Sequence, residues 1–211
     1  MRKFIFLTGI FLVSLGAFAQ EKGDLRMRIR AVGVVPMDDA GVGVIGGNVN
    51  VTNNLIPEID FTYFFTKNFA AELILGTSKH EAVAVSTALG DLDLGSVMLL
   101  PPTLTLQYHY PIKNFKPYVG AGINYTFFYN TGQGRGKNAA VTDVKYDNNV
   151  GFAWQVGFDY NITDKIFFNV DVKKIYLNTD VSVETNLGVT VPADVDLNPW
   201  LIGAGIGFKI L

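Results

Sequence analysis

Hydrophobic and polar residues alternate with a period of two along Leu99–Tyr129, on both sides of a short turn at Pro111–Phe115. One face of each arm is apolar or aromatic, as at Leu106 and Ile123, whereas the other face carries polar residues or glycine, as at Gly122. Strict alternation on both sides of a tight turn predicts an antiparallel β-hairpin. The apolar face points inward in a soluble sandwich or lipocalin, but outward to lipid in an outer-membrane barrel.

The same alternation predicts eight strands along the chain. They are Asp24–Val35, Ile56–Phe65, a strand beginning at Phe69, the two arms of Leu99–Tyr129, Val150–Tyr160, Ile166–Asn178 and Trp200–Leu211. Long loops at 36–55, 78–98, 131–149 and 179–199 alternate with short turns at Thr66, Asn114 and Thr163. This layout and the even strand number are typical of outer-membrane barrels. We therefore expect an all-β fold, an eight-stranded antiparallel transmembrane β-barrel with periplasmic turns, outer loops and its last strand paired with its first.

Outward aromatic residues gather near both ends of the predicted strands, as at the two interfaces of a membrane barrel. Those near the short turns are Tyr63, Tyr108, Tyr110, Tyr160, Phe168 and Phe208. Those near the long loops are Tyr125, Phe127, Tyr129, Trp154, Tyr176 and Trp200. Lys174 is an exception on the apolar face, and its amine is expected to snorkel to the interface. The two girdles favour lipid outside the barrel and polar residues in its lumen.

The amino terminus predicts export. Arg2 and Lys3 precede a short apolar run, and Ala17–Ala19 follows as a small-x-small cleavage site, so 1–19 are expected to be a signal peptide and 20–211 the barrel. No later apolar run is long enough for a transmembrane helix. A mean hydropathy of +0.26 and 13% aromatic residues indicate a surface that faces lipid. We expect the protein in the outer membrane of a Gram-negative bacterium, as a monomer in contact with its lipids.

Charge and composition argue against several classes of function. The 17 basic and 19 acidic residues give a mild negative charge, which argues against nucleic-acid binding, and the chain has no cysteine for a thiolate metal site. Hydroxyl-based catalysis needs a serine, a histidine and a carboxylate close together. His80 follows Ser78 in a predicted loop, and His109 faces the lumen. With two histidines among many carboxylates, such proximity is close to what chance would give. We expect neither an enzyme nor a cofactor or metal centre.

Charged residues fall on the inward face of the strands, mostly in the half nearest the short turns. The inward set is Arg26, Arg28, Arg30, Glu58, Asp60, Glu72, His109, Asp159, Asp171, Lys173 and Lys209. Buried charges must pair or change their ionisation, and an eight-stranded barrel is narrow enough for side chains to fill. We expect a charge plug in the periplasmic half, made of Arg28, Arg30, Glu58, Asp60, Glu72, His109, Asp159 and Asp171. Gly203, Gly205 and Gly207 are expected to make room for the arginine stems.

Four segments carry a resemblance to a known family. Leu100–Leu104, Pro117–Tyr125, Asn198–Trp200 and Gly205–Ile210 resemble, in this order, the repeated motifs of the OmpW family of small outer-membrane barrels. The resemblance implies an eight-stranded barrel, passage of small hydrophobic molecules and recognition by the outer-membrane assembly machinery. Ile210 stands where the family usually ends on an aromatic residue.

Two functions remain open at this point. In the first, small hydrophobic solutes pass Ile74 and leave sideways into the membrane, because the plug blocks the way straight down. The resemblance places Ile74 at the apolar constriction of the family, and Lys173 where a large apolar residue would complete it, so this lumen is expected to be more polar. The alternative for Ile74 is that it only packs against its neighbours and lines no path. The alternative is a structural or receptor barrel with a closed lumen and partner-binding outer loops.

Overall fold

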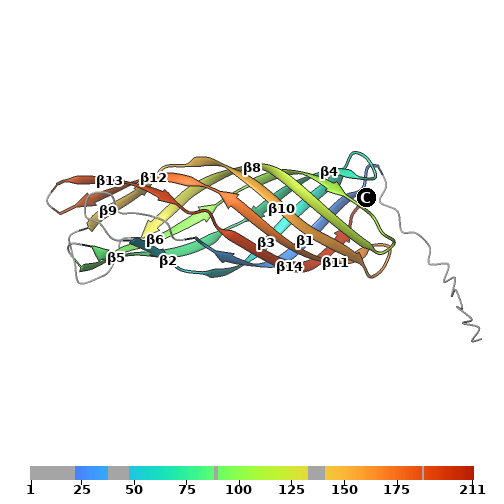
Figure 1. Cartoon of the computed structure of the whole chain (residues 1–211), viewed down its shortest axis with the longest axis horizontal. Helices are drawn as coiled ribbons and strands as arrows, with labels where there is room; N and C mark the ends of the chain where they lie inside the picture. The colour runs from blue at the N-terminus through green and yellow to red at the C-terminus, as the bar shows by residue number, and fades with distance from the viewer. Residues whose placement is uncertain (1–21, 38–47, 88–89, 133–140, 187) are drawn as a thin grey trace, which may run out of the picture.

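The computed structural model describes residues 22–37, 48–87, 90–132, 141–186 and 188–211. Eight long, tilted strands form the wall of a barrel (Figure 1). They are β1 (Leu25–Val35), β3 (Asn54–Phe64), β4 (Phe69–Gly76), β7 (Thr103–His109), β8 (Phe115–Gly132), β10 (Asn149–Asn161), β11 (Ile166–Tyr176) and β14 (Trp200–Lys209). Each pairs antiparallel with the next, which confirms the predicted eight-stranded barrel. The predicted signal peptide lies outside the described residues.

The first and last wall strands close the ring. Their ladder runs from Arg26 opposite Lys209 to Val35 opposite Trp200. Just beyond the pair of Arg26 and Lys209, the Ile210 amide donates to the Leu25 carbonyl at 2.7 Å. A closed ring leaves no unpaired strand edge in lipid, where an unsatisfied backbone group is costly. Among the described residues there is no helix long and apolar enough to cross a membrane.

The prediction of four irregular loops was wrong for the described residues. The long connections contain β2 (Asn48–Val51), β5 (Ser78–Thr87), β6 (Gly90–Leu100), β9 (Val141–Tyr146), β12 (Asn178–Thr185) and β13 (Thr190–Asp196). Strands β2, β5 and β6 continue the barrel sheet beside β8, and β9, β12 and β13 form a second sheet on the opposite side (Figure 1). We call this the long-hairpin end, and the opposite end the short-turn end.

An inverted side-chain pattern explains why these strands escaped prediction. In β5, Lys79 and Glu81 point outward and are exposed, whereas His80 and Ala82 are buried. An outward face that meets water favours charge, whereas an outward face that meets lipid favours apolar residues. The apolar-outward alternation used to find the wall strands therefore does not continue into these hairpins.

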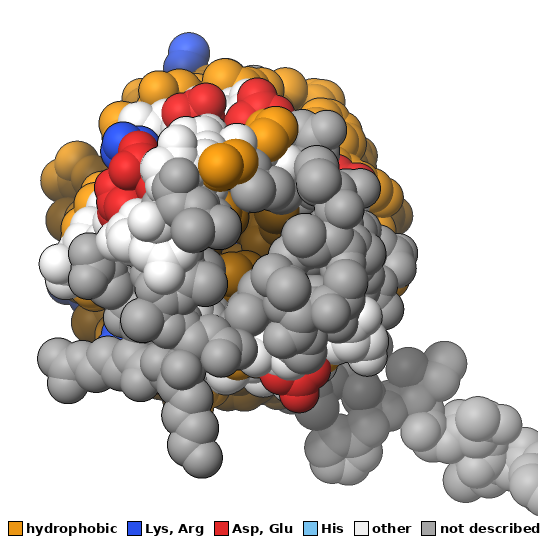
Figure 2. All heavy atoms as spheres, turned by 90° about the vertical axis from the view of Figure 1, so that its left-hand side faces the viewer, with side chains coloured by type: hydrophobic (Ala, Val, Ile, Leu, Met, Phe, Trp, Pro, Cys, Tyr) orange, Lys and Arg blue, Asp and Glu red, His pale blue; other side chains and the backbone are white. Residues whose placement is uncertain are grey.

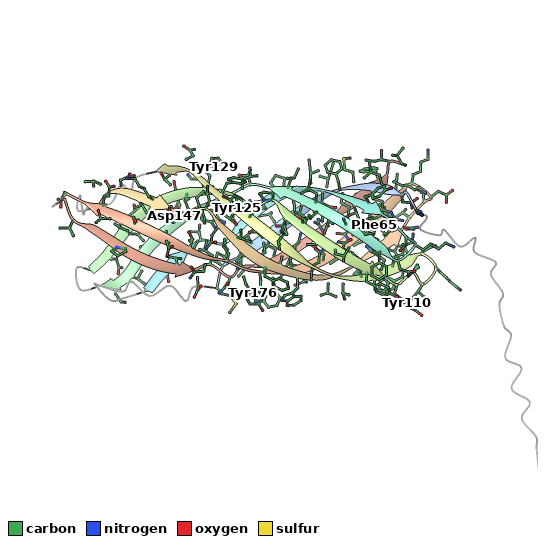
Figure 3. All side chains as sticks on the ribbon, turned by 90° about the horizontal axis from the view of Figure 1, so that it is seen from above. Phe65, Tyr110, Tyr125, Tyr129, Asp147 and Tyr176 are labelled. Atoms are coloured by element: carbon green, nitrogen blue, oxygen red, sulfur yellow. The ribbon has the colours of Figure 1, made fainter. Side chains whose placement is uncertain are left out.

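The outward surface of the wall is apolar, as the alternation predicts. Mid-strand Leu106 and Ile123 are 56% and 60% exposed. Among the labelled aromatic residues, Tyr110 lies near the short-turn end, and Tyr125 and Tyr176 lie toward the middle of the molecule (Figure 3). The resulting separation of aromatic residues is that of a barrel with two interfacial girdles.

Lys174 is held at the barrel wall itself. Its Nζ donates to the carbonyl oxygen of Asn198 at 2.5 Å and lies 4.9 Å from the centroid of the Trp200 ring. Trp200 in turn meets Trp154 edge-on, with 5.6 Å between the ring centroids. The amine is therefore bonded to the turn before β14 and lies against aromatic rings, so the head of this outward lysine has a polar partner at the end of the wall.

The glycines of β14 accommodate different neighbours. A Cβ at Gly205 would clash with the backbone of the neighbouring strand and come within 2.9 Å of Cγ of Arg30, as predicted for an arginine stem. A Cβ at Gly207 would instead clash with the ring of Phe167, so the prediction was wrong for that glycine. A Cβ at Gly203 would come closest to Oδ1 of Asp171, at 2.9 Å. Room for a buried ring and a buried carboxylate is thus as important as room for arginine.

We expect Leu106→Arg to destabilise the barrel, because a mid-strand arginine would face the hydrocarbon core. The expected cost is about 2–4 kcal/mol in the free energy of unfolding if the position lies at the bilayer midplane. Reversible urea unfolding in lipid vesicles measures it. Val189→Arg, in the hairpin between β12 and β13, is the matched control and should leave the unfolding midpoint unchanged. Equal midpoints for both variants would contradict the membrane-facing assignment.

Candidate functional site

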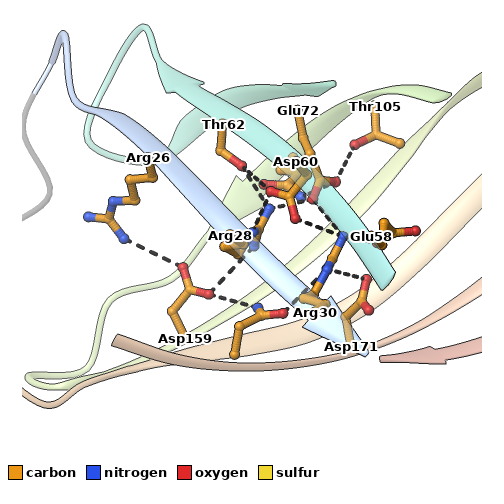
Figure 4. Close-up of polar contacts among 12 residues, drawn as sticks. Arg26, Arg28, Arg30, Glu58, Asp60, Thr62, Glu72, Thr105, Asp159 and Asp171 are labelled. Carbon is orange, nitrogen blue, oxygen red and sulfur yellow. Dashed lines mark hydrogen bonds and ion pairs between the residues drawn. The ribbon is translucent and has the colours of Figure 1, made fainter. Parts of the chain in front are cut away.

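Three arginines project into the lumen from alternate positions of β1 (Figure 4). The central one, Arg28, donates from Nε to Oδ1 of Asp60 at 2.6 Å and from Nη2 to the Thr62 hydroxyl at 2.7 Å. It also pairs with Glu72 on β4. Its side chain is 1% exposed, so these acceptors replace the whole of its hydration. Such a buried cation is tolerable only while its carboxylate partners stay in place.

Glu72 joins this arginine to the opposite side of the barrel. Its Oε2 accepts hydrogen bonds from Thr105 at 3.0 Å, Gln107 at 2.8 Å and Gln155 at 2.5 Å. These donors come from β7 and β10, whereas the arginine comes from β1. One carboxylate therefore connects four strands of the ring across the lumen.

Further ion pairs cross the lumen above and below this centre. Nη1 of Arg30 lies 3.1 Å from Oδ2 of Asp171, and Nζ of Lys173 lies 3.1 Å from Oε1 of Glu58. Toward the short-turn end, Asp159 lies 3.5 Å from both Arg26 and Arg28. The network is therefore continuous between the walls, and its members shield one another from water.

All eight residues predicted as a plug lie in this part of the lumen, and each is at most 3% exposed. His109 is held by a hydrogen bond between its Nε2 and Oε1 of Gln107 at 2.8 Å, and its ring packs on Tyr118 with 4.8 Å between the centroids. Lys209 lies outside the plug at the short-turn rim, where it is 2.8 Å from Asp24. In this structure the short-turn half of the lumen is filled by side chains.

The two residues predicted to line a path lie at the upper border of the plug. Ile74 is 3% exposed and stands opposite Asp60 on one side and Thr103 on the other in the ladder of β4. Lys173 pairs with Glu58 and is 1% exposed, so its amine belongs to the charge network. A constriction formed by these two residues stays a prediction.

An apolar layer directly above the plug was missed by the sequence reasoning. Its buried members are Val32, Val34, Ile56, Ala153, Ile175, Leu177 and Leu201. Ile74 is therefore one of several buried apolar residues on the lumen face. The expectation that Lys173 makes this lumen more polar than that of other family members stays a prediction. The signal was present, because Val32 and Val34 continue the inward parity of the three arginines on β1.

A second apolar cluster lies between the hairpins, farther from the plug. It consists of Ala82, Val144, Val181 and Val195. Leu197 packs against both this cluster and the apolar layer, so the two are continuous. Viewed from the long-hairpin end, the molecule is hollowed, and hydrophobic side chains are visible inside the hollow (Figure 2).

The partners of His80 do not form a catalytic triad. His80 lies in β5, not in a loop, and its Nε2 is 3.0 Å from the Ser78 hydroxyl while its Nδ1 is 2.9 Å from the Thr52 carbonyl. A backbone carbonyl thus occupies the place where a catalytic triad has a carboxylate. In the part of the chain that the structure describes, no group of carboxylates and histidines is arranged to hold a metal ion.

A closed barrel with an apolar outer wall and a charged lumen defines a small outer-membrane barrel protein. The sequence matches the OmpW family over residues 21–210, and the chain belongs to this family of non-enzymatic outer-membrane proteins of Gram-negative bacteria.

Relatives and a solved structure agree with this assignment. The chain is 44% identical to the uncharacterized outer-membrane protein y4mB of Sinorhizobium fredii over 186 residues, which cover 87% of this chain and 79% of that protein. It is 37% identical to Outer membrane protein W of Escherichia coli, over 94% of this chain and 93% of that one. The crystal structure of OprG from Pseudomonas aeruginosa matches with a TM-score of 0.83 and 27% identity, covering 92% of this chain and 98% of that chain.

We expect Arg28→Ala to destabilise the barrel strongly, because it leaves the carboxylates of Asp60 and Glu72 buried without their main cation. Removing one partner of a buried ion pair costs about 3–5 kcal/mol. Lys145→Ala is the control, since this lysine is exposed and pairs with Glu184 at the surface. Urea unfolding in vesicles should show a large fall in midpoint for the first variant and none for the second. Equal midpoints would show that the network does not hold the barrel together.

Proposed function

We propose that this protein lets small hydrophobic molecules into the outer membrane by passive passage through the long-hairpin half of the barrel, followed by lateral exit above the plug. We place the long-hairpin end outside the cell. The observation that carries the proposal is the apolar layer inside the lumen, which lies directly on the charge network. An apolar solute loses nothing by leaving water for such surroundings, whereas an ion or a polar solute loses its hydration.

The charge network makes straight passage into the periplasm unfavourable. Arg28, Glu72 and Asp60 are each at most 1% exposed, and the hydrogen bond from Gln155 of β10 to Glu72 of β4 spans the lumen. A solute forced between them would separate buried charges and leave them without partners. The energetically cheaper direction for an apolar solute is therefore sideways, into lipid.

The wall has a weak place close to Ile74. The ladder between β4 and β7 ends with Ile74 opposite Thr103, and pairing between β5 and β6 resumes in the same register with Ser78 opposite Leu99. Residues 75–77 and 100–102 therefore face each other without ladder pairing. Proline has no N–H to donate to a ladder, and two of these six residues are Pro101 and Pro102. Opening the wall here would break fewer backbone hydrogen bonds than elsewhere.

A relative's name is consistent with apolar cargo. The Pseudomonas aeruginosa protein named "Dibenzothiophene metabolism operon protein PahQ" is 29% identical over 172 residues, which cover 79% of this chain and 77% of that protein. This name supports the class of solute and leaves the route to be tested on this chain.

The competing function is a closed structural or receptor barrel, and one observation favours it. Val32 and Ala153, inside the apolar layer, are wholly buried, which supports a lumen that is closed at this level. Passage would require the apolar layer to rearrange around the solute. Uptake measurements in vesicles separate the two functions.

We expect Ile74→Trp to reduce uptake of a hydrophobic tracer by proteoliposomes without preventing folding, because the larger side chain would occupy the space beside the wall opening. Leu73→Trp is the matched control, since Leu73 is 41% exposed on the outward face of the same strand. Tracer uptake equal in wild type, both variants and protein-free vesicles would leave only the closed-barrel function.

The double substitution Pro101→Ala and Pro102→Ala tests the exit. Consecutive backbone groups of a strand face opposite neighbours, and the Pro102 carbonyl already accepts from Tyr125 on β8, so the N–H restored at position 101 is the one that faces β4. The ladder with β4 can then continue, and we expect slower tracer release into the bilayer together with a higher unfolding midpoint. A stopped-flow assay with a membrane-sensitive fluorescent tracer measures the release. Unchanged release by a variant with a raised midpoint would place the exit elsewhere.

A further inference from the structure

Two aromatic rings stack on the inward face at the long-hairpin end. Phe128 of β8 and Tyr146 of β9 have ring centroids 5.4 Å apart and an interplanar angle of 15°. Both side chains face inward, because their neighbours Phe127 and Lys145 are exposed on the outward face. Both rings are half-buried, so part of their surface stays accessible.

The ring pair connects the two apolar clusters of the lumen. Phe128 packs against the apolar layer above the plug, and Tyr146 packs against the cluster between the hairpins. Leu197 contacts both clusters as well. A solute moving from the hairpins toward the apolar layer therefore moves along this pair of rings.

We infer that Phe128 and Tyr146 form a binding site for planar aromatic solutes on the way into the barrel. The inference rests on the proposed function and names its substrate class. Aromatic rings in contact gain stabilisation beyond the burial of apolar area, whereas a saturated ring of similar size gains only the burial. The site thus prefers flat aromatic molecules over saturated hydrocarbons.

The Tyr146 hydroxyl adds a polar contact to this site. Among the residues that the structure describes, none forms a hydrogen bond with it. Burial raises the pKa of Tyr146 to about 12, so the phenol keeps its proton at neutral pH and remains a donor. An aromatic solute with an oxygen substituent fits both the rings and this donor.

Uptake of naphthalene and of decalin, its saturated analogue, by proteoliposomes tests the inference. We expect the wild-type protein to raise the naphthalene-to-decalin uptake ratio about three- to tenfold above that of protein-free vesicles. Phe128→Leu and Tyr146→Leu should return the ratio to the protein-free value and leave decalin uptake unchanged. Tyr146→Phe keeps the ring and should keep the ratio. Phe127→Leu, on the outward face of the same strand, is the matched control.

The possible failures are distinguishable. Uptake of both solutes above protein-free vesicles, with an unchanged ratio, would overturn the aromatic site and leave the proposed function intact. If neither solute is taken up faster than by protein-free vesicles, the proposed function is overturned. The aromatic site is then tested by naphthalene binding to the detergent-solubilised protein. Binding that is lost in Phe128→Leu and kept in Phe127→Leu supports the site, and binding equal in both variants overturns it. Tyr146→Phe and Phe128→Leu keep the test valid if Tyr146→Leu does not fold.

Discussion

Arg28 and the carboxylates of Asp60 and Glu72 form the contact on which the rest of the barrel depends. A cation that is 1% exposed needs partners supplied by several strands, and here they come from β3, β4 and β10. The side-chain period of a strand is two, so a one-residue slip of β1 would turn its three arginines toward lipid. The network therefore fixes the register of the ring, and ring closure in turn removes the strand edges that lipid would not tolerate.

The same network determines what the lumen is able to do. It fills the short-turn half with paired charges, so an apolar layer at Val32 and Leu201 becomes the floor of the accessible part. Apolar solutes are compatible with that floor, and ions are not. In the function proposed above, the unpaired stretch around Pro101 and Pro102 is where the wall would open. Sealing and the proposed lateral release would then both follow from one arrangement.

The sequence predicts the wall strands well because each has one face in lipid and one in the lumen. Inward parity alone placed Arg28 and Glu72 in the lumen, and the family resemblance agreed with the strand number. The hairpins beyond the membrane were missed because their outward face meets water, as at Lys79. The pairing of Lys173 with Glu58 could not be predicted from the sequence either, because these residues lie on β11 and β3 and meet only when the ring closes. Likewise, the sequence around Gly207 does not show that the ring of Phe167, on β11, is its neighbour in the barrel.

If a sealed charge network and an apolar compartment coexist in one barrel, hydrophobic molecules should enter it while ions stay out. Hydrophobic tracer uptake and potassium leak are to be measured together in the same proteoliposomes. We expect tracer uptake above that of protein-free vesicles with no increase in potassium leak. A potassium leak that rises with the amount of protein, with or without tracer uptake, would show that the network does not seal the lumen.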